Sequence, residues 1–310
     1  MTIALFGYSH FTRQCAVALG NLGFEVVLFC PRQDERFFRE AGMLSSGLPV
    51  TWFDGMEDPL LGEALNDLKP DFILSIIFNH VIPEPITGKA RKAALNVHPA
   101  PLPQVRTASV WFWPLRLGLS RTEICVHHLT PGMDEGPAIL PYPFSLPHND
   151  TQGTHAAKLA RMAPGVMKAL EPILRSDPTP PGEPQGDGHW YPSVQEADLW
   201  INFGEPAETI RNLVRASNPC HPARTNFRGK TLGIHEMYCV EASPAPAEPG
   251  ELYIHQSPAP ELWIGCGDRS ARLAVVAVPG EGVFSAEAFI TLYGVQDGEM
   301  MGGGQQRSGE

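Results

Sequence analysis

The sequence predicts an α/β protein, in which a Rossmann-like domain is followed by a small β-barrel. In the N-terminal half, buried apolar runs alternate with helical patterns, which is typical of a parallel sheet covered by helices. In the C-terminal third, short strands are separated by turn residues at the spacing of a small barrel. Residues 176–184, SDPTPPGEP, have the composition of a linker between the two.

The chain begins with a βαβ unit. Residues 3–7 form an apolar run that ends in glycine, as a buried parallel strand does. Residues 11–22 carry apolar positions at helical spacing, and residues 25–29 form the next strand. The first loop, Gly7 to Phe11, lacks the G-x-G-x-x-G pattern that brings a backbone close to a pyrophosphate. A bound dinucleotide is therefore not expected.

The rest of the first domain continues the alternation. Residues 32–40 have the mixed charge of a short exposed helix, and residues 50–53 are apolar and β-branched enough for a strand. Residues 71–78 form a clear buried strand. We expect an extended segment over 141–147 and a helix over 151–174, which begins at capping residues.

The second domain combines one amphipathic helix with short strands. The helix is expected over residues 206–216, and Asn218–Pro219 ends it. The strands are expected over residues 231–235, 251–254, 261–265 and 272–276. The predicted boundaries are 1–180 for the first domain, 181–204 for the linker, 205–300 for the second domain and 301–310 for a disordered Gly-rich tail.

Two polar residues stand at the end of a strand in the middle of the chain. Asn96 and His98 are two residues apart, so their side chains project from the same face of that strand. The prolines that follow end the strand, since proline has no N–H for the ladder. After the next strand, residues 123–129, a turn at Pro131–Gly132 leads to Asp134, whose carboxylate can reach His98. This arrangement predicts a polar site at the edge of the sheet.

These motifs resemble those of the formyltransferases that use 10-formyltetrahydrofolate. That family carries Asn-x-His-Pro-Ser-Leu-Leu-Pro and then Asp-x-Gly, and this chain has Asn96-Val97-His98-Pro99-Ala100-Pro101-Leu102-Pro103 and then Asp134-Glu135-Gly136. The interval between the two motifs is also similar. The resemblance implies a Rossmann-like catalytic domain, a C-terminal barrel of the OB type, and 10-formyltetrahydrofolate as the formyl donor, with no metal.

The resemblance also implies catalytic roles for Asn96, His98 and Asp134. When an amine attacks the formyl carbon, the carbonyl oxygen becomes an oxyanion and the nitrogen must lose a proton. The Asn96 amide and a protonated His98 are suitable donors to the oxyanion. Asp134 can hold the imidazolium and accept the proton of the amine. A nucleophilic Ser or Cys is not needed, because the amine itself attacks.

Further residues are implied for the two substrates. The donor pocket is expected at the strand end and loop after residue 77 and at the Asp134 loop, with the residues Phe78, Asn79, His80, Val81, Ile82, Met133 and Asp134. The acceptor is expected near Tyr8, Ser9, His10, Arg106 and Trp111. The alternatives remain open: the loop after residue 77 and the Tyr8 loop are also readable as plain connections, and Trp111 and Trp113 as core residues.

The composition of the chain indicates which partners are expected. The formal net charge is −11 and no stretch is densely basic, so nucleic acid is not the expected partner. Members that act on tRNA usually carry a long basic loop where this chain has the mixed-charge residues 32–40. The six cysteines are scattered without metal-ligand spacing, and neither a leader nor a long apolar run is evident. We expect a cytoplasmic enzyme, away from membranes, that is a monomer or a homodimer.

Three activities and one non-catalytic role remain open. The favoured one is N-formylation of a small amine, such as an aminosugar nucleotide or an amine derived from an amino acid. The second is the formylation of methionyl-tRNA. The third is hydrolysis of 10-formyltetrahydrofolate, in which water replaces the amine. A binding or scaffold module is disfavoured because all three polar residues are present.

Overall fold

The computed structural model describes residues 1–240, 248–256 and 258–302, so most of the predicted tail, residues 303–310, lies outside the described residues. Contacts divide the chain into two compact units. The first comprises residues 1–110, 121–145 and 155–193, and the second comprises residues 111–120, 146–154 and 194–310. Much of the predicted linker therefore packs with the first unit, while two segments from within the predicted first domain belong to the second unit.

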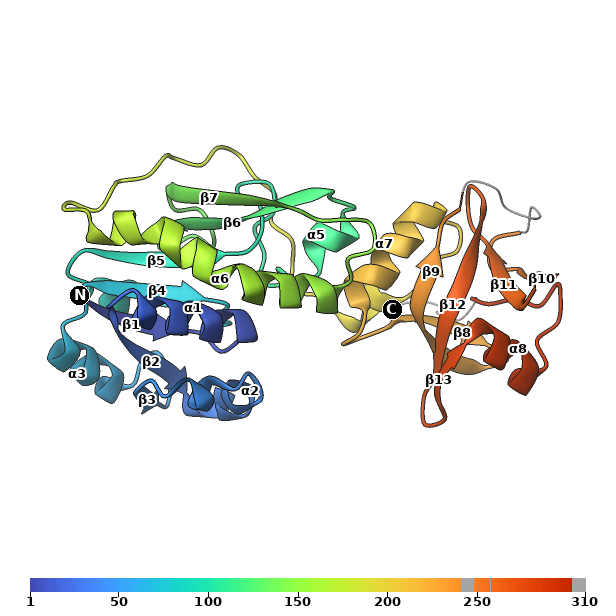
Figure 1. Ribbon diagram of the computed structural model, residues 1–310, viewed down its shortest axis with the longest axis horizontal. Coiled ribbons are helices and arrows are strands. Elements are labelled where there is room, and N and C mark those ends of the chain that lie inside the picture. Colours follow the sequence, from blue (N-terminus) through green and yellow to red (C-terminus); the bar gives the residue numbers. More distant parts are fainter. Residues whose placement is uncertain (241–247, 257, 303–310) are drawn as a thin grey trace, which may run out of the picture. The chain divides into compact units, whose positions relative to one another are not determined.

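The first unit is built on a seven-stranded sheet in the order β3-β2-β1-β4-β5-β6-β7 (Figure 1). Strands β1 to β5 are parallel, and β6 and β7 are antiparallel to their neighbours. The strands are β1 Thr2–Phe6, β2 Glu25–Pro31, β3 Val50–Phe53, β4 Phe72–Ile76, β5 Ala93–His98, β6 Arg121–His128 and β7 Ala138–Ser145. The predicted Rossmann-like sheet is confirmed.

Helices cover this sheet because each presents an apolar stripe to it. Leu61 and Leu65 of α3, for example, are fully buried against Phe6 and Phe29 of the sheet. The helices are α1 His10–Asn21, α2 Glu35–Glu40, α3 Pro59–Leu68, α4 Glu84–Thr87 and α6 Gln152–Arg175, with 3₁₀ helices η1 Arg32–Asp34 and η2 Met43–Ser46. The predicted helices over 11–22 and 151–174 are confirmed as α1 and α6.

The second unit is a six-stranded antiparallel sheet. Its order is β10-β11-β12-β9-β8, and β13 also pairs with β12. The strands are β8 Ala223–Phe227, β9 Lys230–Tyr238, β10 Leu252–Gln256, β11 Pro260–Gly265, β12 Ser270–Val278 and β13 Gly282–Ser285. The helices are α5 Trp113–Arg116, α7 Ala207–Ser217 and α8 Ala286–Tyr293, with a 3₁₀ helix η3 Glu196–Leu199. The predicted strands and the amphipathic helix are confirmed.

The segment 111–120 helps to form the apolar core of the second unit. Phe112 and Leu115 are buried in that core, and Trp113 packs against it. For Trp113 the structure therefore favours core packing over stacking on a substrate. Within the described part of the chain, no helix is both long and apolar enough to cross a membrane.

Candidate active site

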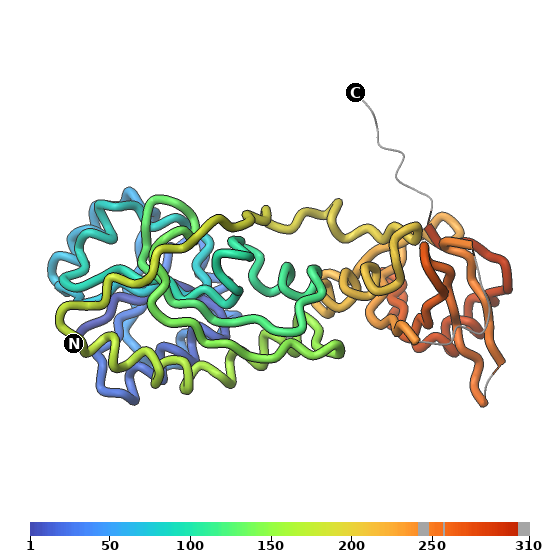
Figure 2. The backbone as a smooth tube through the Cα atoms, turned by 90° about the horizontal axis from the view of Figure 1, so that it is seen from above, coloured from blue at the N-terminus to red at the C-terminus, as the bar shows by residue number. Residues whose placement is uncertain are grey.

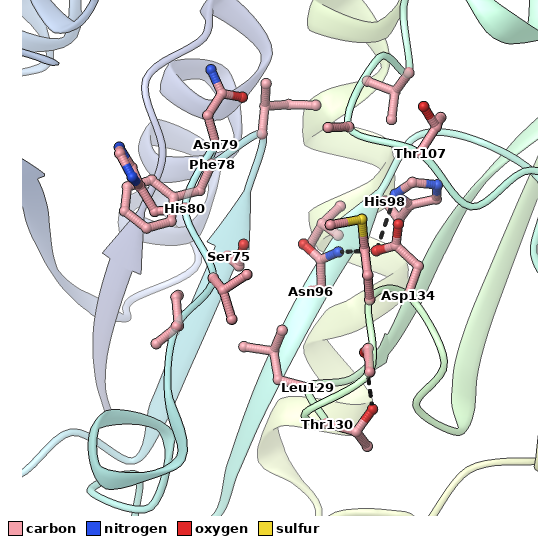
Figure 3. A pocket seen from close by; sticks show the side chains of 18 of the residues that line it. Ser75, Phe78, Asn79, His80, Asn96, His98, Thr107, Leu129, Thr130 and Asp134 are labelled. Carbon is pink, nitrogen blue, oxygen red and sulfur yellow. Dashed lines mark hydrogen bonds and ion pairs between the residues drawn. The ribbon is translucent and has the colours of Figure 1, made fainter. Parts of the chain in front are cut away.

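The candidate site lies where β4 and β5 end at the carboxyl edge of the parallel sheet, the usual place for ligands in open α/β sheets. Strand β4 pairs with β5, and β5 pairs with the antiparallel β6, so that Asn96 faces Ser75 on one side and His127 on the other. Strand β6 then leads into the turn that carries Asp134. Three neighbouring strands and one turn thus bring the polar residues to one place (Figure 3).

One carboxylate oxygen joins the three residues that the sequence predicts to be catalytic. The Asn96 Nδ2 atom donates to Asp134 Oδ1 over 3.1 Å. The His98 Nδ1 atom lies 3.5 Å from the same oxygen, and His98 Nε2 donates to the carbonyl of Val105 over 3.0 Å. The side chains of His98 and Asp134 are 4% and 9% exposed, so the cluster is shielded from water.

His127 is a fourth member of this cluster, and the sequence analysis missed it. Its Nδ1 atom donates to the carbonyl of His128 over 2.9 Å, so in that tautomer its Nε2 atom accepts from Asn96 Nδ2 over 3.1 Å. The same Nε2 atom lies 3.5 Å from Asp134 Oδ1. His127 lies opposite Asn96 on the next strand. The sequence could have pointed to it only if the register between the two strands were known.

Burial and neighbouring charges set the protonation of the cluster. Burial acts to raise the pKa of Asp134, but His98, His127 and the backbone N–H of Thr107 together hold it below its ordinary range. Burial also holds the pKa of His98 below its ordinary value, and His127 acts in the same direction, while Asp134 opposes them. At neutral pH the site therefore holds an anionic Asp134 beside a neutral His98.

The backbone of the Asp134 turn explains the Asp-x-Gly motif. Asp134 itself has a φ of 54°, in the left-handed region that costs a non-glycine residue about 1–2 kcal/mol. A Cβ atom at Gly136 would lie only 1.8 Å from the carbonyl oxygen of His128. Glycine is thus required two residues after Asp134, because the turn runs directly over the end of β6. Ile77, across the site, has a φ of 51° and is also strained.

A cavity of about 170 Å³ opens beside these groups. Its lining includes Asn96, His98 and Asp134, together with every residue predicted for the donor pocket: Phe78, Asn79, His80, Val81, Ile82 and Met133. Apolar walls with a few convergent polar groups suit a small organic ligand. Among the described residues, no group of three His, Cys, Asp or Glu side chains is placed to hold a metal ion.

The residues predicted for the acceptor are absent from the described lining of this cavity. Tyr8 is buried, and burial together with the Asp34 carboxylate raises its pKa. The Ser9 hydroxyl caps α1, accepting from the N–H of Thr12 over 3.0 Å. His10 is exposed at the start of that helix. Arg106 donates to Gly186, and Trp111 is part of the second unit.

The fold and the site define a class of protein. A Rossmann-like sheet with an amide, two imidazoles and a carboxylate at its carboxyl edge, beside an apolar cavity, is suited to moving a small acyl group without a covalent enzyme intermediate. Comparison with known proteins gives the family. Residues 54–169 match the family described as formyl transferase, and residues 193–294 match the formyl transferase C-terminal domain. The chain belongs to the formyl transferase family and is an N-formyltransferase.

Similar proteins include methionyl-tRNA formyltransferases. That of Syntrophus aciditrophicus is 28% identical over 207 residues, which are 66% of this chain and 66% of that protein. That of Bacillus licheniformis is 24% identical over 297 residues, covering 92% of this chain and 93% of that protein. The matches are spread over both units.

Solved structures share the fold. HypX from Aquifex aeolicus, in complex with tetrahydrofolic acid, superposes with a TM-score of 0.63 at 18% identity and covers 94% of this chain, which spans 46% of HypX. An N-formyltransferase from Helicobacter canadensis, in complex with folinic acid and dTDP-3-aminofucose, superposes with a TM-score of 0.66 at 14% identity, covering 91% of this chain and 99% of that protein.

The Gly136→Ala variant should lose about 1–3 kcal/mol of unfolding free energy, the usual range for overpacking, because its methyl group meets the His128 carbonyl. Gly132→Ala is the matched control in the same turn, since a Cβ there meets only the movable Glu135 side chain. Urea unfolding of both variants measures the difference. Equal losses in the two variants would contradict the close approach at Gly136.

The stability of the protein should fall as the pH drops below 6.5. An unfolded histidine binds a proton near its ordinary pKa of 6.5, whereas buried His98, facing Asp134, His127 and the Val105 carbonyl, binds one only at lower pH. The unfolded state therefore holds more protons between the two values, and stability rises with pH there. His98→Gln should show a shallower slope in this window in urea unfolding, and His221→Gln, at an exposed position, should keep the wild-type slope.

Proposed function

We propose that this protein transfers the formyl group of 10-formyltetrahydrofolate to the amine of a small molecule, such as an aminosugar nucleotide or an amine derived from an amino acid. The observation that carries the proposal is the convergence of Asn96 and His98 on the Asp134 carboxylate at the edge of the cavity. The family membership supports the formyl group as the unit transferred. The tetrahydrofolate in the HypX structure and the folinic acid in the Helicobacter canadensis structure support a reduced folate as its carrier.

The Asp134–His98 pair is suited to accept the proton of the amine. As the nitrogen lone pair forms a bond to the formyl carbon, the π electrons move to the oxygen and the nitrogen becomes acidic. Asp134 accepts this proton directly or through water. His98 can then share it, because Nε2 is committed as a donor to Val105 and Nδ1 faces the carboxylate. The intermediate collapses when the bond to N10 of the folate breaks and the carbonyl forms again, and N10 takes up the proton that Asp134 and His98 hold, which restores the carboxylate.

The same proton transfer releases a donor for the oxyanion. In the free protein the Asn96 amide nitrogen donates to Asp134 and to His127. A protonated carboxyl group is a weaker acceptor than a carboxylate, so the Asn96 N–H turns to the negative oxygen of the intermediate. Burial strengthens this interaction because water does not screen it. Asn96 thereby stabilises the charge only after the amine has attacked.

Electrostatics favours a small acceptor. Three arginines of the mixed-charge segment form ion pairs with carboxylates of the protein itself: Arg32 with Asp54, Arg36 with Glu40 and Arg39 with Glu35. The net charge of −11 acts in the same direction, since it repels a polyanion.

In the second unit, too, arginines are engaged with the protein itself. Arg211 donates to Glu208 and to the carbonyl of His148, and Arg215 donates to the carbonyl of Pro147. These guanidinium groups satisfy backbone and carboxylate oxygens instead of facing phosphates, which supports an acceptor other than a nucleic acid.

Formylation of methionyl-tRNA is the second candidate. It is favoured by the similar proteins from Syntrophus aciditrophicus and Bacillus licheniformis, which are named methionyl-tRNA formyltransferases. A hydrolase would use the same residues with water as the acceptor. The three activities differ only in what attacks the formyl carbon, so the products distinguish them.

Incubation with 10-formyltetrahydrofolate and a panel of amines, including initiator Met-tRNA, identifies the acceptor by mass spectrometry. We expect a small amine to gain a formyl group and its turnover to change little with salt. Binding of tRNA through 6–10 phosphates would instead weaken by about 10³–10⁵ between about 50 and 200 mM salt. Formylation of Met-tRNA alone would overturn the proposed acceptor, and release of tetrahydrofolate without an amine would indicate the hydrolase.

Asn96→Ala should lower turnover by about 10²–10³, the usual effect of removing one donor to an oxyanion. His98→Ala should lower it by about 10²–10⁴, the usual contribution of a group that takes part in proton transfer. Binding of tetrahydrofolate should remain, because the residues expected to hold the donor, from Phe78 to Ile82 and Met133, are unchanged. Single-turnover kinetics and a folate binding titration measure the two quantities. His221→Ala, at an exposed position, serves as the matched control, and near-normal turnover in either site variant would remove that residue from the mechanism.

A further inference from the structure

The segment that follows α6 lies on the first unit beside both catalytic loops. Figure 2 shows it as an extended trace along that unit. We call residues 180–191 the strap. Its Glu183 exchanges two backbone hydrogen bonds with Ala138, at 2.7 and 2.8 Å. Further along, the N–H of Arg106 donates to the carbonyl of His189 over 3.0 Å. The sequence predicts only a linker here, so these contacts require another explanation.

The strap is fitted closely to the loop that follows β5. A Cβ atom at Gly188 would lie 2.0 Å from the carbonyl oxygen of Pro103. Two residues later in that loop, the carbonyl of Val105 accepts the hydrogen bond from His98. The strap therefore supports the backbone that orients the His98 ring.

One side chain of the strap contacts both loops. The Gln185 Nε2 atom donates to the carbonyl of Gly136 over 2.6 Å. Its Oε1 atom accepts from Arg106 Nη2 over 3.5 Å, and the same Nη2 donates to the carbonyl of Gly186 over 3.1 Å. Gly136 ends the turn that carries Asp134, and Arg106 follows Val105 directly. Gln185 thus connects the Asp134 turn to the His98 loop.

The two loops are also joined by contacts of other kinds. Arg106 and Glu135 form an ion pair at 3.8 Å, and Glu135 is largely exposed, so this pair is weak. The backbone N–H of Thr107 donates to Asp134. Trp190 of the strap donates from Nε1 to Met133 Sδ over 3.3 Å, but both side chains are exposed. The short amide-to-carbonyl bond from Gln185 is the firmest of the contacts that the strap makes with the turn.

We propose that Gln185 is a positioning residue, which holds the Asp134 turn at the distance from His98 and Asn96 that proton transfer requires. The inference rests on the proposed function, since it assigns Gln185 a part in the same reaction through Asp134. The physical reason is that Asp134 sits in a strained backbone conformation, from which an unsupported turn relaxes. A displacement near 1 Å is enough to cost about 10²-fold in rate.

Gln185→Glu is the sharpest test. The carboxylate keeps the length of the side chain and can still accept from Arg106, but it has no N–H for Gly136 and repels its carbonyl. We expect kcat to fall between about 10- and 100-fold while the Kd for tetrahydrofolate stays within about twofold. Gln185→Ala should behave similarly. Asp187→Asn, an exposed position on the strap, is the matched control and should keep wild-type turnover.

A double-mutant cycle separates positioning from general support of the fold. If Gln185 acts through Asp134, then Gln185→Glu should cost less than about threefold in single-turnover rate when Asp134→Asn is already present. The inference would be overturned if the rate losses of the two single variants multiplied in the double variant. A loss of thermal stability without any change in kcat would overturn it equally.

A measurement that does not depend on turnover tests the positioning role of Gln185 separately from the proposed function. In ¹H–¹³C spectra, Gln185→Glu should move the ring signals of His98 and His127, while Asp187→Asn should leave them in place. Unmoved His98 and His127 signals would overturn the positioning role. If the wild type formylates no amine but these signals still move, the proposed function fails and the positioning of Asp134 by Gln185 stands.

Discussion

The site depends on the Oδ1 atom of Asp134. Asn96, His98 and His127 all lie within 3.5 Å of this one oxygen. Burial acts to raise the pKa of Asp134, but His98, His127 and the backbone N–H of Thr107 together lower it. These contacts keep the buried carboxylate in its charged form. The surrounding structure can be understood as the means of keeping this oxygen in place.

The sheet supplies three of these four groups rigidly. Asn96 and His98 share a face of β5, and the pairing with β6 puts His127 opposite Asn96. Asp134 is different, because it comes from a turn and has an unfavourable backbone conformation. Two contacts at Gly136 restrict this turn. Gly136 lies close against the His128 carbonyl, and its own carbonyl accepts a hydrogen bond from Gln185. A rigid sheet therefore carries Asn96, His98 and His127, and a supported turn carries Asp134.

The cavity and the charge distribution are two separate features of the molecule. Apolar walls lie beside Asn96 in the cavity, and an apolar surrounding strengthens electrostatic contacts. Away from the site, arginines of the first unit's mixed-charge segment and of α7 pair with carboxylates or carbonyls of the protein. These positive charges are therefore matched by groups of the protein itself, while the site has the Asp134 carboxylate at its centre.

The sequence by itself determined the alternation of strands and helices, the short strands of the second unit, and the pair of motifs at Asn96 to Pro103 and Asp134 to Gly136. These features are local, since period, proline and glycine report on the backbone around them. Only the tertiary structure assigned His127 to the site, because its position depends on the register between β5 and β6. It also assigned residues 111–120 to the core of the second unit and the strap to the first. Such contacts join residues distant in sequence, and no local pattern of residues encodes them.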